Sequence, residues 1–241
     1  MSKEQLTVCV PGGCAQEDVS RAVDAAMAPY DYNRDEGAGV PVVETWWDYW
    51  KIDGRGCEFS VAQGYEADPR LIRGTETLTG QPRNVPPSLC DGGPRALLDL
   101  EGPRAQAAAD ERRAFDAWQT FSSAYPPAYP ADHFWARHFA GPEGYPQAQV
   151  IEDYRTQPVI AALTDQPELN DLIGGDPVAR YAYGLDTLIR DATDGVLATQ
   201  ALLTLDGQWL TISSAEQKRH FNDYLDELAA DVLVVRVIYH G

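Results

Sequence analysis

The fold is decided by residues 201–239, which read ALLTLDGQWLTISSAEQKRHFNDYLDELAADVLVVRVIY. Asp206-Gly207 lies between two short apolar runs and is a strong β-hairpin signal, because both central turn positions favour a positive φ. Ser214, with a Gln three residues later, forms a capping box ahead of apolar residues at helical spacing. Residues 232–239 are apolar enough for a strand buried on both faces. The segment therefore predicts a hairpin, a helix and a central strand.

The N-terminal part of the chain carries a complementary pattern. Residues 6–10 are a β-branched run that ends at a Pro-Gly-Gly turn, and apolar residues at helical spacing follow. Residues 46–52, WWDYWKI, lead into a second Asp-Gly pair, Asp53-Gly54, and predict another hairpin with residues 55–61. We therefore expect an α+β fold, in which ferredoxin-like halves from both chain ends form a mainly antiparallel sheet with helices on one face.

The middle of the chain, residues 62–200, lacks this pattern. Its first part is rich in Pro and Gly without a sustained period, which is typical of a long loop. The Ala-rich residues 103–123 predict a helix, and Asp176-Pro177 predicts the start of another, with a cap residue and a proline in the first turn. We expect residues 1–241 to form a single α+β domain, with 62–200 as a loop-rich and helical insertion between the sheet halves.

The charge of the chain limits its partners. Its 241 residues include 19 Lys and Arg against 37 Asp and Glu, a formal net charge of −18 at pH 7. Such an excess of negative charge opposes attraction to nucleic-acid phosphates and to anionic membrane surfaces. No apolar run approaches the roughly 20 residues of a membrane span. We therefore expect a cytoplasmic protein that binds neither nucleic acid nor membrane.

The residues that could bind metal or act as nucleophiles are scattered. The four cysteines are too few for a disulfide scaffold and are expected to be reduced: Cys9, Cys14, Cys57 and Cys90. His133 and His138 are five residues apart, which puts them on different faces of a helix. Nothing in the sequence aligns a base with a thiol. We expect no metal site and no cofactor, and the pattern favours a protein that is not an enzyme.

The aromatic segment holds the densest group of candidate site residues. Its ligand-binding candidates are Trp47, Asp48, Tyr49, Trp50 and Arg55. The rings could stack a base or a sugar that Asp48 and Arg55 fix by charged hydrogen bonds. In the other interpretation one face of the strand fills the core and the other lies under the inserted helices, and Asp48 and Arg55 pair with each other to order the hairpin. On a strand, Trp47 and Trp50 are expected to face opposite sides.

The same segment supports a family resemblance. Residues 28–33, APYDYN, and residues 47–55, WDYWKIDGR, resemble a family of uncharacterised proteins of bacteriophages, prophages and actinobacterial genomes, whose second motif reads roughly W-D-W-W-x-I-G-G-R-W. Residues 154–158, YRTQP, and 205–209, LDGQW, are similar to later landmarks of that family. Gly56 stands where the family has Trp, and the Gly- and Trp-rich segment after the final hairpin is absent. The resemblance implies a fold and a mobile-element context, without an activity.

Three classes of function remain after these observations. We expect an uncharacterised, cytoplasmic, non-catalytic binding or regulatory protein of mobile-element type, whose acidic surface binds a host protein with a basic surface. The alternative is a small-molecule protein or enzyme that binds a nucleotide or sugar at the hairpin Trp46–Arg55. A virion or assembly component is the third. The sequence assigns no catalytic residue and no oligomeric state.

Overall fold

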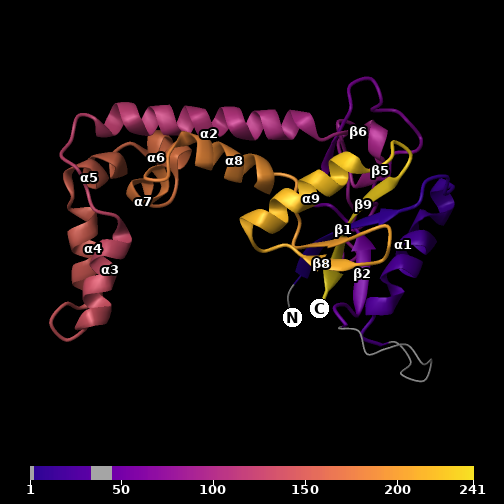
Figure 1. Ribbon diagram of the computed structural model, residues 1–241, viewed down its shortest axis with the longest axis horizontal. Helices are drawn as coiled ribbons and strands as arrows, with labels where there is room; N and C mark the ends of the chain where they lie inside the picture. Colours follow the sequence, from indigo (N-terminus) through magenta and orange to yellow (C-terminus); the bar gives the residue numbers. More distant parts are fainter. Residues whose placement is uncertain (1–2, 34–44) are drawn as a thin grey trace. The chain divides into compact units, whose positions relative to one another are not determined.

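The computed structural model describes residues 3–33 and 45–241. The chain forms two compact units (Figure 1). The sheet unit comprises Met1–Arg104 and Asp194–Gly241, and the helical unit comprises Ala105–Thr193. The predicted α+β class is therefore confirmed, with the strands in one unit and a run of helices in the other.

One mixed sheet forms the centre of the sheet unit. Its strands are β1 (Lys3–Val10), β2 (Tyr49–Ile52), β5 (Gly92–Pro94), β7 (Ala201–Leu203), β8 (Trp209–Thr211) and β9 (Leu233–His240). Their order is β2-β9-β1-β7-β8, and β5 also pairs with β9. β1 and β7 are parallel, whereas β9 is antiparallel to β1, β2 and β5, and β7 is antiparallel to β8. Both ends of the chain thus supply the central strands, as the sequence predicts.

The apolar run of β9 is explained by its position. β9 pairs with β1 along its whole length, from Lys3↔His240 to Val10↔Leu233. Helix α1 (Val19–Met27) packs on one face of the sheet, through a core that includes Val8, Val23, Met27 and Val235. Helix α9 (Ala215–Glu227) packs on the other, through a core that includes Cys9, Phe221, Leu225 and Val234. The ferredoxin-like halves with helices on one face are not confirmed, because α1 and α9 cover opposite faces.

A second, smaller sheet lies on the α9 side of the core. It consists of β3 (Phe59–Val61), β4 (Leu89–Cys90) and β6 (Leu98–Asp99), in the antiparallel order β4-β3-β6. Three short 3-10 helices complete the named elements of the sheet unit: η1 (Gln16–Asp18), η2 (Ala28–Tyr30) and η4 (Arg95–Leu97). Much of the Pro- and Gly-rich segment is therefore part of the sheet unit and carries strands of its own.

The two predicted hairpins have different outcomes. The hairpin at Asp206-Gly207 is confirmed, because β7 pairs with β8 across it and Gly207 has a φ of 80°. The predicted capping box is also confirmed, since Ser214 caps α9 together with Gln217. The hairpin at Asp53-Gly54 is wrong. There β2 pairs with β9, whereas β3 pairs with β4 and β6.

The side chain of Asp53 explains this difference. It is fully buried, and its Oδ1 lies 3.2 Å from the Nε of Arg83. The backbone N–H of Gly54 donates to Oδ1 of Asp91 at 2.6 Å. Long-range ionic contacts therefore fix this Asp-Gly pair, and Gly54 has no positive φ.

The helical unit lies within residues 62–200, where an insertion is predicted. Its helices are α2 (Glu101–Ser122), α3 (Ala131–Ala140), α4 (Gln147–Arg155), α5 (Pro158–Thr164), α6 (Pro167–Ile173), α7 (Pro177–Tyr181) and α8 (Leu185–Gly195); α2 begins and α8 ends within the sheet unit. Its main core includes Ala114, Trp118, Val159, Ile160, Leu163, Ile173 and Tyr181. The predicted cap at Asp176 is confirmed, because its carboxylate accepts from two backbone N–H groups of α7. No helix among residues 3–33 and 45–241 has the length and apolar character to cross a membrane.

Candidate functional site

The two candidate tryptophans of the aromatic segment both contact α1. Trp47 is buried, and its Nε1 donates to the carbonyl oxygen of Met27 at 3.0 Å. Trp50 is half-buried, and its Nε1 donates to Oδ1 of Asp24 at 3.3 Å. The expectation that they face opposite sides is wrong, because the strand begins only at Tyr49. Trp47 is a core residue, whereas Trp50 keeps part of its ring accessible.

The other three candidates do not meet around one ligand position. Oδ1 of Asp48 lies 2.7 Å from Nδ1 of His240. The guanidinium of Arg55 lies 3.3 Å from Oδ2 of Asp53, so the predicted pairing of Asp48 with Arg55 is wrong. Tyr49 is 47% exposed. Asp48 and Arg55 therefore contact different charged or polar residues, His240 and Asp53.

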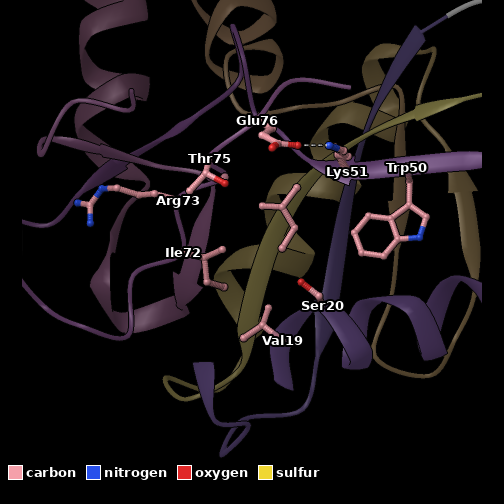
Figure 2. A pocket seen from close by; sticks show the side chains of 10 residues that line it. Val19, Ser20, Trp50, Lys51, Ile72, Arg73, Thr75 and Glu76 are labelled. Carbon is pink, nitrogen blue, oxygen red and sulfur yellow. Dashed lines mark hydrogen bonds and ion pairs between the residues drawn. The ribbon is translucent and has the colours of Figure 1, made fainter. Parts of the chain in front are cut away.

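A cavity of about 410 Å³ lies beside Trp50 (Figure 2). We call it the Trp50 cavity. Helix α1 contributes Val19 and Ser20 to its wall, β2 contributes residues 50–52, and the segment 72–76 supplies the remaining wall. Figure 2 shows Trp50 on one side, Ile72 and Arg73 on the other, and Val19 at the α1 end. Its volume falls within the range of roughly 300–1,000 Å³ that is usual for small-molecule sites.

An ion pair marks the rim of the Trp50 cavity. Nζ of Lys51 lies 2.5 Å from Oε2 of Glu76, and the two side chains are 25% and 53% exposed. The hydrogen bond to Glu76 raises the pKa of Lys51, and the same bond lowers the pKa of Glu76. Both groups are therefore charged near neutral pH, and they balance each other.

The second cation near the cavity is already engaged. The guanidinium of Arg73 donates to the carbonyl oxygens of Leu89, Glu66 and Pro87, at 3.0, 3.1 and 2.9 Å. In Figure 2 it points away from Trp50. Arg73 thus fixes the loop around it, and Lys51 is the other cation among the residues that line the cavity.

A buried ionic network holds the 72–76 wall in place. We call it the Arg83 cluster, and it consists of Asp53, Glu58, Arg83 and Asp91. Arg83 donates to both carboxylate oxygens of Asp91 at 3.0 Å, and Oδ2 of Asp91 accepts from the backbone N–H of Gly74 at 2.6 Å. Because a buried carboxylate needs a cation and hydrogen-bond donors, these contacts give the cluster a structural role.

The four cysteines, all within the described residues, have free thiols. Cys9 and Cys90 are buried, and burial raises the pKa of their thiols to about 12 and about 11. Such thiols stay protonated and unreactive at neutral pH. Cys14 is half-buried and lines a second cavity of about 680 Å³. Val19 of α1 lines both this cavity and the Trp50 cavity. Among residues 3–33 and 45–241, no three His, Cys, Asp or Glu side chains converge as metal ligands do.

The helical unit presents a stacked aromatic pair, one half-buried ring and one exposed ring, that we did not predict as a site. On α3, the rings of Trp135 and Phe139 stack at a centroid distance of 5.8 Å. Phe139 is 76% exposed, whereas Phe134 on the same helix is buried against Tyr145 and against Val150 of α4. The i, i+4 spacing of Trp135 and Phe139 is the sequence signal that could have revealed this pair.

No family model, no curated protein and no solved structure matches this chain. The resemblance to phage, prophage and actinobacterial proteins therefore stays a prediction from the motifs. The candidate sites rest on the geometry of the chain itself.

Proposed function

We propose that the protein is a non-catalytic binding protein, and that its helical unit binds a protein partner with a basic surface. The observation that carries this proposal is the stacked pair Trp135–Phe139, in which Phe139 is 76% exposed. Exposed, pre-stacked aromatic side chains are typical of the centre of a protein interface, because they bury a large area at a small entropic cost.

The charge around this pair supports a basic partner. Acidic residues outnumber basic ones in Ala105–Thr193, and Asp132 and Glu152 are exposed on α3 and α4. The nearby Arg137 lies over the ring of Tyr145 at 4.1 Å, so its charge is partly engaged within the unit. Lysine and arginine side chains of a partner could contact both the carboxylates and the exposed ring of Phe139. The mobile-element context of this proposal rests on the sequence resemblance alone.

A pull-down from a host lysate at low and at high salt tests the proposal, with a double variant, Trp135→Ala with Phe139→Ala. Tyr183→Ala is the matched control, because Tyr183 is an exposed aromatic residue of the same unit, at 72% exposure. We expect the same basic protein to be captured by the wild type and the control, less of it at high salt, and little by the double variant. Equal capture by the double variant, or capture unchanged by salt, would contradict the proposal.

A further inference from the structure

The Trp50 cavity is lined by both polar and apolar side chains and carries one balanced pair of charges. Val19 and Ile72 are buried in its wall, and Trp50 is half-buried. The charges at its rim are the ammonium of Lys51 and the carboxylate of Glu76, 2.5 Å apart. Apolar side chains beside two opposite charges favour a ligand that has an apolar part together with one positive and one negative group.

The charge balance argues against a phosphate-containing ligand. Arg73 is held by three carbonyl oxygens, and Lys51 is already paired with Glu76. The net charge of −18 adds a long-range repulsion for any anion. A ligand with a single charge would leave either Lys51 or Glu76 without its partner. A ligand with both charges can replace the internal ion pair by two external ones and leave no charge unmatched.

We propose that the Trp50 cavity binds a free amino acid with an apolar side chain. Its carboxylate accepts from Nζ of Lys51, and its ammonium group donates to the carboxylate of Glu76. Its side chain packs against Trp50, Ile72 and Val19. A free amino acid carries both charges on groups bonded to one carbon atom, whereas a peptide separates its two termini. This site is independent of the Trp135–Phe139 pair.

Isothermal titration calorimetry of the full chain with L-leucine and L-phenylalanine tests the proposal. N-acetyl-L-leucine, which lacks the ammonium group, and L-leucinamide, which lacks the carboxylate, are the matched ligands. Since a hydrogen bond to a charged group contributes about 1.5–3 kcal/mol, we expect each blocked ligand to bind at least about tenfold more weakly than leucine. Similar affinity for leucine and a blocked ligand, or no binding of either free amino acid up to about 10 mM, would overturn the proposal.

Variants of the chain locate the site. Lys51→Gln and Glu76→Gln should each weaken leucine binding about tenfold or more. Arg113→Gln is the matched control, because Arg113 forms an exposed ion pair with Asp110 on α2, at 2.9 Å. Its affinity for leucine should equal that of the wild type. Thermal unfolding checks that the variants fold. Leucine affinity unchanged in both Lys51→Gln and Glu76→Gln would place any binding elsewhere and refute the proposed site.

Discussion

The two Asp-Gly pairs of the sheet unit occupy opposite environments. Around Asp206 the contacts are local, since its carboxylate accepts from the hydroxyl of Thr204 at 2.5 Å and from Nε2 of Gln208 at 2.7 Å. Asp53 also has a local partner, Arg55, but in addition it contacts Arg83, which is distant in sequence. The same dipeptide therefore forms the turn of a hairpin where all its side-chain partners are local, and a buried ionic cluster where a distant arginine joins them. Turn propensity decides the structure only where no long-range contact competes with it.

The largest effect on the stability of the fold should come from removing the cation of the Arg83 cluster. In Arg83→Met, three carboxylates lose a guanidinium whose side chain is only 6% exposed. Breaking a buried ion pair from one side costs about 3–5 kcal/mol, and we expect a loss of that size in the free energy of unfolding, measured in urea. Arg113→Met, at an exposed pair, should change it by less than about 1 kcal/mol. Equal losses in the two variants would contradict the structural role of the Arg83 cluster.

Replacing Gly54 or Gly207 by alanine should destabilise the fold, but for a different physical reason at each position. In Gly54→Ala, the new Cβ would lie 2.9 Å from Oδ1 of Asp91 and 3.1 Å from Cβ of Arg236. Overpacking of this kind costs typically about 1–3 kcal/mol, and we expect about 2 kcal/mol in urea unfolding. An unchanged unfolding midpoint would contradict this close packing around Gly54.

Gly207→Ala should cost less, because a Cβ there meets no atom within 4 Å and only its φ of 80° is unfavourable for alanine. We expect about 1 kcal/mol in thermal or urea unfolding. Gly207→Asn should lose less than Gly207→Ala, since asparagine tolerates this region better. If the two variants were equally destabilised, backbone strain would not be the cause.

The smallest effect is the pH dependence of the exposed turn. The hydrogen bond from Thr204 lowers the pKa of Asp206 below its ordinary value of 3.8. A carboxyl whose pKa is lowered in the folded state stabilises the fold above its unfolded pKa, and this contribution is lost as the pH falls through the folded pKa. Asp206→Asn should therefore unfold with a slightly flatter dependence on pH below about pH 4. Urea titrations at several acidic pH values measure this slope, and a steeper slope would show that the sign is wrong.

The parts of the fold that the sequence predicted are those governed by neighbouring residues. The 201–212 hairpin, the Ser214 cap and the central strand β9 depend on local turn, cap and burial patterns. The pairing of β2 with β9, and the order within residues 62–104, depend on contacts such as Asp53 with Arg83. Spacing along the chain does not encode which distant residues meet, so this part could not be predicted from local patterns.

In the candidate site, too, the long-range contacts are the part that the sequence did not predict. Trp50 was predicted as a ligand-binding residue and does line a cavity. The ion pair of Lys51 was not predicted, because its partner Glu76 lies 25 positions away in a segment interpreted as a loop. Asp48 and Arg55 were grouped because they are close in sequence, yet His240 and Asp53 are the residues they contact. Sequence proximity therefore assigned the wrong electrostatic partners to Asp48 and Arg55.

The position of β9 in the sheet determines how the protein can fold during its synthesis. β1 leaves the ribosome before the helical unit, and its antiparallel partner β9 follows that unit. Thr7 and Arg236, which are hydrogen-bonded, are 229 positions apart. The helical unit has its own core, so it can fold while β1 is still unpaired. The nascent chain therefore carries an apolar strand without this partner while the helical unit is made. An unpaired apolar strand is a risk for aggregation until β9 is released.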